Sequence, residues 1–521
     1  MTSISKFLFI AAHIVIFFAY NSIFAQAQQE ITIQKAGFLE FTEIAGERTY
    51  FLANNVVLQQ KDILLYCDTA YLYSSRNAAV AIGNVHINQA DTVHAYGDSA
   101  TYDGNNKIAV LYHNVKLTDR SMILSTENLT YNLEIKTGTY INGGTLDNGD
   151  TKLSSELGYY YAQSSDAFFR KNVKLQHPEY ALEADTLQYN TEMDRAYFHG
   201  PTTIYNKKSK VYCEKGYYDS KPGIAVFNQN VKLENPPQEL FADSIFYNRE
   251  TGIGKAYRNI IFRDTAENVL QYSQYGEYNE LTQTLLSTKS PVAAYALEGD
   301  TLFIAGDTIR LMEDTAGLKT LLVYYHVRIF KTDLQGVCDS LKYADADSII
   351  YMFGEPVLWS DSTQFSADSI QLAMVLQQLH TIQLNKNALI ANEIDSLIYN
   401  QVKGRNITGL FQNQELYKVE VRGNAESIYY GQDDLKRYIG VNKAVCSGID
   451  IYIRANKFTR ITFKEMPESV FTPMQQVNIR EFRLDNFKWE KNKQPKSKEE
   501  LFYYSGETEN PNDAKSLQKE G

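Results

Sequence analysis

A short pattern that recurs about every 30 residues constrains this chain more than any other feature. The pattern is Asn-Val-x-Leu, with Ile as an alternative in the last place, and its copies begin at Asn55, Asn84, Asn114, Asn172 and Asn230. The steps between them are 29, 30, 58 and 58 residues, and degenerate copies near Asn142-Gly143-Gly144 and Gly200-Pro201-Thr202 divide the two double steps. A fixed period of this length is typical of stacked repeats, in which each copy buries the apolar face of its neighbours.

A second pattern runs in phase with the first. It is an acid, then a small or hydroxyl residue, then an apolar-x-Tyr sequence, as in Asp98-Ser99-Ala100-Thr101-Tyr102. The acids stand at Asp68, Asp98, Glu127, Glu156, Asp185, Glu214 and Asp243, always 29 or 30 residues apart. Looser copies continue the series at Asp307, Asp339 and Asp368. The repeat therefore extends into the second half of the chain.

The repeats are predicted to be β-strands. In each Asn-Val-x-Leu copy the apolar side chains alternate with polar ones, as in a strand with one buried face. Gly, Asn and Asp separate the runs as turns require, and no segment between copies has a long helical periodicity. The 38 Tyr, 26 Phe and only 11 Pro also favour strands. We predict an all-β fold, either an open β-solenoid or an extended, twisted two-sheet sandwich with about 30 residues per repeat.

The apolar residues of the first pattern are expected to form one continuous inner stripe. The stripe consists of Val56, Leu58, Val85, Ile87, Val115, Leu117, Val173, Leu175, Val231 and Leu233. If the two sheets close fully on each other, this stripe is ordinary core. If the sheets splay apart, the stripe lines a long groove suited to acyl chains, and these ten residues become candidate lipid-binding residues.

The ends of the chain differ from its repeats. Residues 1–27 resemble a secretory signal peptide, with an apolar run from Phe7 to Tyr20 and small residues at Ala25-Gln26-Ala27. The run is too short for a membrane span, which needs ~20 residues. We expect β-repeat modules over 28–290 and, more divergent, over 291–465, and a C-terminal segment over 466–521 that is disordered after about Glu490.

Four cysteines in an exported chain raise the question of disulfides. Cys67, Cys213 and Cys338 each precede the acid position, but they are separated by several repeats. Strands stack ~4.8 Å apart, so these residues should lie at least ~19 Å from one another. A disulfide needs Cα atoms within ~7 Å. We expect free, mostly buried thiols, including Cys446 in its different local context.

The sequence offers little for catalysis. An acid in nearly every repeat does not single out the pair of carboxylates that glycoside hydrolysis needs, so we expect these acids to cap turns or to bond neighbouring N–H groups. The eight His have no metal-ligand spacing, and no phosphate loop or nucleophile motif is present. We therefore predict no enzymatic activity, no metal and no cofactor.

The net charge of the chain indicates which classes of binding partner fit it. Without residues 1–27 the chain keeps 50 basic side chains, because only Lys6 is lost, against 62 acidic ones, a net charge of −12. Nucleic acid, which needs a basic surface, is thereby excluded. Lys116, Lys174 and Lys232 recur in one position of alternate repeats. They fit solvent-facing lysines that protect sheet edges, or a row of cations for an anionic glycolipid.

These phased patterns resemble the OstA-like family, which includes the periplasmic lipopolysaccharide-transport protein LptA and the N-terminal periplasmic domain of LptD. The best single match is Ala81-Ile82-Gly83-Asn84-Val85-His86-Ile87 followed by Ala95-Tyr96-Gly97-Asp98-Ser99-Ala100-Thr101-Tyr102. The resemblance is good over 45–290 and weak over 300–465. It implies a twisted, half-open β-jellyroll that shields lipid A acyl chains between its sheets, and modules that stack end to end by strand addition.

The chain departs from its relatives in being much longer than a single LptA module and in lacking the LptD barrel. The resemblance favours a periplasmic carrier of lipopolysaccharide or a related glycolipid that contributes to outer-membrane assembly. Its expected partners are an LptD-like outer-membrane protein, other transport components and further copies of itself. The alternative is a structural or adhesive envelope β-solenoid with a dry core. Bound lipid would favour the first hypothesis, and a filled interior with capped ends would favour the second.

Overall fold

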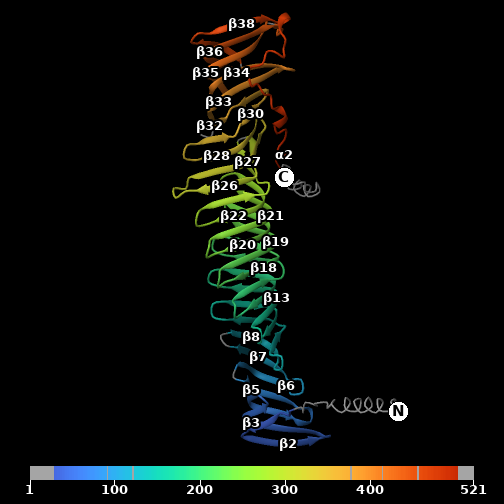
Figure 1. The fold of residues 1–521 in the computed structure, drawn as a ribbon. Helices are drawn as coiled ribbons and strands as arrows, with labels where there is room; N and C mark the ends of the chain where they lie inside the picture. The colour runs from blue at the N-terminus through green and yellow to red at the C-terminus, as the bar shows by residue number, and fades with distance from the viewer. Residues whose placement is uncertain are drawn as a thin grey trace, which may run out of the picture. The chain divides into compact units, whose positions relative to one another are not determined.

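The computed structural model describes residues 29–502. Within this range it leaves out Asp91, Arg120, Ser121, Glu298, Leu376, Gln377, Gln414, Asp434, Ala455 and Asn456. The predicted signal peptide therefore lies outside the described residues. The described residues form 38 strands and almost no helix, and their pairings are antiparallel (Figure 1). The all-β fold class is confirmed, and the chain divides into two compact units, residues 1–200 and 201–521.

The first unit (unit 1) is made of β1 to β15 and one 3₁₀ turn. Its elements are β1 (Thr32–Lys35), β2 (Phe38–Ile44), β3 (Glu47–Gln60), β4 (Ile63–Tyr73), η1 (Ser74–Arg76), β5 (Ala78–Gln89), β6 (Val93–Asp103), β7 (Ile108–Asp119), β8 (Met122–Asn132), β9 (Thr137–Tyr140), β10 (Gly144–Asp147), β11 (Lys152–Ser155), β12 (Leu157–Tyr161), β13 (Asp166–Gln176), β14 (Ala181–Asn190) and β15 (Arg195–Phe198). Most are long strands of 10 to 14 residues that pair with the next strand along the chain.

The second unit (unit 2) contains the remaining strands and, near its end, short helical turns. Its elements are β16 (Thr202–Tyr205), β17 (Lys210–Cys213), β18 (Lys215–Asp219), β19 (Ile224–Asn235), β20 (Gln238–Asn248), β21 (Ile253–Asp264), β22 (Val269–Asn279), β23 (Thr284–Thr288), β24 (Val292–Leu297), β25 (Asp300–Ala305), β26 (Thr308–Glu313), β27 (Lys319–Lys331), β28 (Leu334–Ala344), β29 (Ile349–Phe353), β30 (Val357–Ser360), β31 (Thr363–Ser366), β32 (Ser369–Val375), β33 (Gln378–Asp395), β34 (Ile398–Gln412), β35 (Glu415–Gln432), β36 (Tyr438–Arg454), β37 (Lys457–Lys464), β38 (Glu468–Pro473), η2 (Met474–Gln476), η3 (Lys491–Lys493) and α2 (Glu499–Phe502). The change of module that we expected near residue 290 falls inside this unit.

Each strand that carries the Asn-Val-x-Leu pattern bends at the Asn of that pattern. In β7 His113 and Asn114 have φ angles of 62° and 51°, and the pairing with β8 skips from Tyr112 to Val115. Asn tolerates this left-handed conformation better than most residues, which explains why it recurs at the bend. We call the bend the corner, the half that carries Val-x-Leu sheet A, and the half on the other side of the corner sheet B. Two facing sheets therefore arise from one set of strands.

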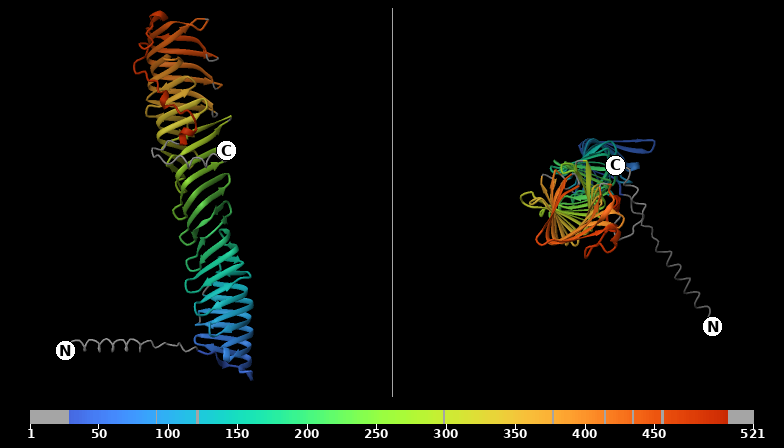
Figure 2. Two further views of the ribbon diagram at one scale, coloured as in Figure 1. Left: turned by 90° about the vertical axis from the view of Figure 1, so that its right-hand side faces the viewer. Right: turned by 90° about the horizontal axis from the view of Figure 1, so that it is seen from above.

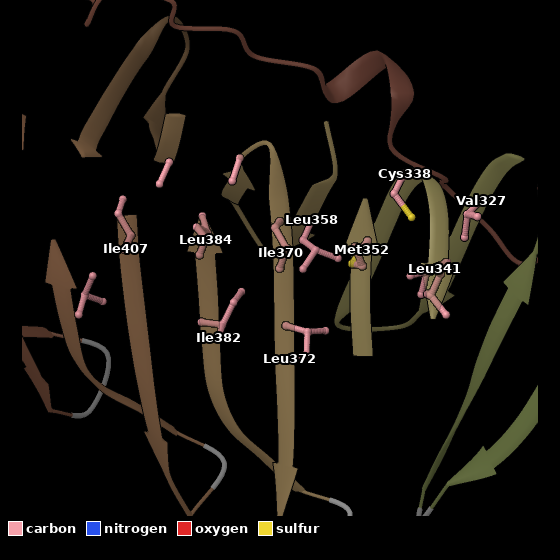
Figure 3. Close-up of a cluster of buried hydrophobic side chains, with 14 of the residues drawn as sticks. Val327, Cys338, Leu341, Met352, Leu358, Ile370, Leu372, Ile382, Leu384 and Ile407 are labelled. Carbon is pink, nitrogen blue, oxygen red and sulfur yellow. The ribbon is translucent and has the colours of Figure 1, made fainter. Parts of the chain in front are cut away.

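The core lies between sheets A and B. In unit 1 side chains from both halves of β7 are fully buried, among them Leu111 in sheet B and Leu117 in sheet A. In unit 2 a row of apolar side chains from successive strands fills the interior from Val327 to Ile407 (Figure 3). This interior is continuous from strand to strand, as stacked repeats require.

The C-terminal segment of unit 2 folds back along the outer face of sheet A (Figures 1 and 2). Leu484 is buried there against Ile428 and Tyr430, and Leu501 against Val292. Because these sheet residues alternate with those of the inner core, the segment forms a third layer. We expected disorder beyond about Glu490, and this was wrong for residues 491–502, which are ordered against the sheet. The rest of the expected tail lies outside the described residues.

Hydrogen bonds to glutamine side chains fix this segment. Gln401 donates to the carbonyl of Phe482 at 3.1 Å and accepts from the N–H of Leu484 at 2.9 Å. Gln364 makes the same pair of bonds with Lys488 and Glu490, each at 2.8 Å. A side-chain amide can mimic one step of a β-ladder, so the segment is held without being a strand.

Candidate functional site

The acids of the second pattern are part of the corners. Asp98 accepts a hydrogen bond from Nδ2 of Asn114 at 2.8 Å, and Glu214 accepts one from Asn230 at the same distance. Bonds of this kind with a spacing of 16 residues also join Asn84 to Asp68, Asn172 to Glu156 and Asn259 to Asp243. The two sequence patterns thus form a ladder that ties each Asn corner of these five pairs to the preceding repeat. We expected turn caps or backbone bonds, and the main partner is instead the Asn side chain.

The ladder explains why the acids recur without any need for catalysis. Every rung of it is solvent-exposed, and its carboxylate accepts a hydrogen bond from the amide of an Asn. Among the described residues no group of three or more His, Cys, Asp or Glu could hold a metal ion. The same part of the chain contains no helix long and apolar enough to span a bilayer.

The predicted inner stripe does face the interior. Nine of its ten residues, from Val56 to Val231, are only 0–2% exposed. The tenth, Leu233, is half-buried. The stripe is thus packed against the opposite sheet over most of its length, and only its last residue, Leu233 in β19 of unit 2, is partly accessible.

Hydrogen bonds between the ends of the two sheets keep the interior of unit 1 closed. These ends lie away from the corners, and we call the bonds between them latches. Tyr102, at the end of sheet B, donates to Oε1 of Gln60 at the end of sheet A. Gln60 in turn donates to the carbonyl of Gly104 at 2.9 Å, and Gln89 donates in the same way to Leu133 at 2.8 Å.

The next two repeats carry latches of the same design. The hydroxyl of Tyr160 donates to Oδ2 of Asp119 at 2.6 Å, over a separation of 41 residues. Nδ2 of Asn148 donates to the hydroxyl of Tyr189 at 3.0 Å over the same separation. Burial raises the pKa of the Tyr189 hydroxyl, so the latch keeps its neutral form well into the alkaline range.

Strands β19 to β23 of unit 2, residues 224–288, lack such latches; we call them the open segment. Tyr247 stands where Tyr160 and Tyr189 stand in their repeats, but its hydroxyl donates to Glu280, at 3.0 Å, at its own end of sheet B. Asp264 stands where Asp119 does, but its carboxylate accepts from Gln238 and from N–H groups of its own turn. At the far end of the segment, an ion pair at 2.8 Å between Glu267, in the turn between β21 and β22, and Lys319 takes the place of a tyrosine latch.

The inner face of the open segment is partly exposed. Its half-buried apolar and aromatic residues are Leu233, Leu240, Tyr247, Phe262 and Leu285. Gly254 and Gly276 on this face are also less tightly enclosed than Gly144 of unit 1. A Cβ placed on Gly254 or Gly276 would have no neighbour nearer than 3.8 or 3.6 Å, whereas in unit 1 a Cβ on Gly144 would lie 2.7 Å from the Tyr140 ring. This accessible, apolar inner face is the candidate binding site.

The lysine row and the cysteines add little to this site. Lys116 and Lys174 are exposed on the outer face of sheet A, and Lys232 is held there by Glu234 and Glu239, which raise its pKa. The four cysteines are free and buried, as expected. Burial raises the pKa of Cys67 to about 11, so its thiol is inert at neutral pH.

Sequence reasoning missed the latches and the C-terminal third layer. The signal for the latches was present, because Gln60, Gln89 and Asp119 each follow the last apolar residue of their repeat by two positions and share its inward direction. A polar residue that recurs on a buried face needs a partner. The third layer leaves a fainter signal in Val357-Leu358-Trp359, a strand without polar alternation.

Comparison with known proteins agrees with the repeat pattern. Residues 28–185 and 181–243 match the sequence model of the family described as OstA-like protein. No curated protein matches the chain. Among solved structures, the chain is similar to the extracellular domain of a putative one-component system from B. thetaiotaomicron, at 8% identity over 80% of this chain and 92% of that chain, but the TM-score of 0.09 supports no shared fold. Over residues 28–243, the chain is therefore similar in sequence to the OstA-like protein family.

Proposed function

We propose that this protein carries lipopolysaccharide or a related glycolipid through the periplasm and so contributes to outer-membrane assembly. OstA-like proteins are envelope proteins related to lipopolysaccharide transport, and the family is not catalytic. The observation that carries the proposal is the half-buried apolar inner face of the open segment. Acyl chains fit such a face because they are long, flexible and wholly apolar.

The burial pattern indicates where lipid would enter. Leu233 belongs to the stripe and is already accessible, so we propose the open segment as the first place of contact. Within unit 1, Val56 to Leu175 would contact acyl chains only after latches such as Tyr160–Asp119 have opened. The ten stripe residues thus remain proposed acyl contacts of unequal accessibility.

Two neighbouring residues of β21 allow a sharp test. Phe262 faces the interior, because its register partner is Leu240, and Ile261 faces outward. A photo-crosslinking amino acid placed at position 262 in the cell should capture glycolipid, and the same group at 261 should not. Mass spectrometry of the captured species would identify the ligand. If the folded protein captures no glycolipid with the crosslinker at position 262, 261 or 233, the proposal is contradicted.

The second candidate function is a structural or adhesive envelope solenoid with a dry core. Its support is the closed interior of unit 1, where stripe residues such as Leu117 are fully buried. Such a protein would extract from the envelope free of lipid and would keep its stability when lipid is removed. Lipid that co-purifies at a fixed ratio would exclude it.

The outer strands of each unit suggest how partners could attach. In unit 1, β2 pairs only with β3 among the described residues and exposes Phe38, Leu39, Phe41 and Ile44. In unit 2, β38 pairs only with β36 in the described chain and exposes Val470 and Phe471. An apolar edge strand is a template for strand addition. We propose that these edges dock further copies or an LptD-like outer-membrane protein, and Phe41→Lys should weaken that docking in a pull-down.

A further inference from the structure

Two inward-facing positions of the open segment are polar where the other repeats are apolar. Gln271 occupies a position that is filled in earlier repeats by Leu65, Ala95, Leu124, Leu153, Leu182, Val211 and Leu240. Ser287 lies in a register row of unit 2 whose other members are Phe227, Ile245, Ala256, Gly276, Ile309 and Val323. Close packing of the core alone does not require polar residues at these two positions.

The two polar side chains meet across the interior. Nε2 of Gln271, in sheet A, donates to Oγ of Ser287, in sheet B, at 2.5 Å. Both residues are buried, at 7% and 3% exposure. The bond uses an acceptor position of Ser287, and among the described residues no acceptor takes the proton of its hydroxyl. That proton is therefore available to a ligand.

Ser273 is the second observation. It lies two residues from Gln271 on the same inner face, in register with the buried Ile260, and is only 5% exposed. Its Oγ has no hydrogen-bond partner in the described part of the chain. Thr126 and Ser155, at the same position of two repeats in unit 1, instead donate to the carbonyls of Gly143 and Leu157, each at 2.7 Å. A buried hydroxyl without a partner is destabilising, so its retention here needs a reason.

We propose that Ser273 and Ser287, with Gln271 holding Ser287 in place, form a recognition site for a polar group on a bound acyl chain. The group would be a hydroxyl or a carbonyl, because a serine hydroxyl can donate to either. Gly276 and Ala256 follow Ser287 in its register row, so the side chains beside the site are small. The inference rests on the proposed function, since it requires a chain in the interior. It adds to that function a preference for functionalised over plain chains.

The test compares three chains of equal length on the delipidated protein that spans residues 28–521. Hexadecanoic acid, 3-hydroxyhexadecanoic acid and 3-oxohexadecanoic acid would each displace a fluorescent fatty acid. Comparing the affinities of the 3-hydroxy and the 3-oxo acid shows whether the site binds a hydroxyl or a carbonyl group. We expect at least one of them to bind about fivefold more tightly than the plain chain, the usual effect of one buried hydrogen bond.

Variants assign the preference to the site. Ser273→Ala and the double variant Gln271→Leu/Ser287→Ala should bind all three chains alike, whereas Ser273→Thr, which restores the residue of the Thr126 position, should keep the preference. Thr284→Ala is the matched control, because Thr284 lies on the strand of Ser287 and donates to Thr282 in an exposed turn. Thermal melting would verify that each variant folds.

The outcomes separate this inference from the function on which it rests. Equal binding of all three chains by the unaltered protein overturns the recognition site and leaves lipid carriage standing. A preference that survives both Ser273→Ala and the double variant overturns it as well. Binding of no chain at all contradicts the proposed carriage and the recognition site together.

Discussion

Unit 1 and the open segment of unit 2 are built from the same repeat, with the same corners and the same alternation, yet they enclose different interiors. In unit 1 a latch such as Tyr160–Asp119 joins the ends of the two sheets in successive repeats, and the stripe is sealed. In the open segment Tyr247 turns to its own sheet, and Leu240 and Phe262 are half-buried. One difference between the two regions lies in the polar contacts at the sheet ends.

This comparison distinguishes two structural features of the repeat, the corner ladder and the latches. The corner ladder is present in both regions, as Asn114–Asp98 and Asn230–Glu214 have the same distance of 2.8 Å. The latches are present in only one. A repeat can therefore keep its architecture while the hydrogen-bond partner of its tyrosine changes. The remainder of unit 2 adds a third layer on its outer face, which is absent from the described part of unit 1.

The largest contrast should come from a charge placed in the same inner position of both regions. Leu182 and Leu240 are equivalent residues 58 positions apart, the first 1% exposed and the second half-buried. Leu182→Asp should destabilise unit 1 by about 4 kcal/mol, because the carboxylate has no partner in the core. Leu240→Asp should cost about 1 kcal/mol and should abolish lipid capture.

Hydrogen exchange measured by mass spectrometry is suited to this pair, because a repeat protein can lose one region without unfolding as a whole. Faster exchange should be confined to the strands around each substitution. Equal destabilisation by the two variants would show that the open segment is as closed as unit 1.

A smaller contrast should come from the latch tyrosines. Tyr160→Phe removes the donor to the buried carboxylate of Asp119 and should cost about 2 kcal/mol, the usual effect of losing a bond to a charged group. It should also admit lipid to unit 1, which a crosslinker at Leu117 would detect. Tyr247→Phe, at the equivalent position, loses only an exposed bond to Glu280 and should change stability by less than about 0.5 kcal/mol.

Substitution of the corner Asn should reduce the free energy of unfolding by a similar amount in both regions. Asn114 and Asn230 have φ angles of 51° and 54° and equivalent carboxylate partners. Asn→Ala at either position should cost about 1 kcal/mol, through the lost hydrogen bond and the strain of Ala in a left-handed conformation. Chemical denaturation followed by local hydrogen exchange would measure both. A much larger loss at Asn114 than at Asn230 would mean that corners and latches are coupled.

The sequence was enough to predict the fold class, the repeat, the inner stripe and the free cysteines, because these follow from period, alternation and spacing. Val115 and Leu117 could be assigned to the interior from two-residue alternation alone. Whether that interior is open could not be predicted, since the latches join residues 41 to 44 positions apart. Their pairing depends on how far the two sheets splay, which no local pattern encodes. The order of residues 491–502 was missed for the same reason, because their partners, such as Gln335, lie far away in sequence.

The smallest perturbation tests the comparison without changing stability much. Cysteine placed at 240 should react readily with a maleimide at pH 7.5, whereas cysteine at 182 should be protected by the closed interior. The four native cysteines are buried and should react little with the maleimide. The pKa of Cys67 is raised to about 11 by burial, and its ordinary value is near 9.0, so its thiolate fraction at pH 9 should be roughly 50-fold lower in the folded than in the unfolded chain.

The sign of this pH effect follows from the charged form of the thiol. Because the folded chain holds the Cys67 proton more tightly than the unfolded chain does, unfolding releases that proton between about pH 9 and 11, and stability should fall as the pH rises through this range. The maleimide comparison is therefore best made at pH 7.5, below this window, where reaction at position 240 reports access and not unfolding. Adding Tyr160→Phe to Leu182→Cys should then raise the reactivity of position 182 toward that of 240. If it leaves position 182 protected, the sheets of unit 1 are held together by apolar packing, and the tyrosine latches do not control entry.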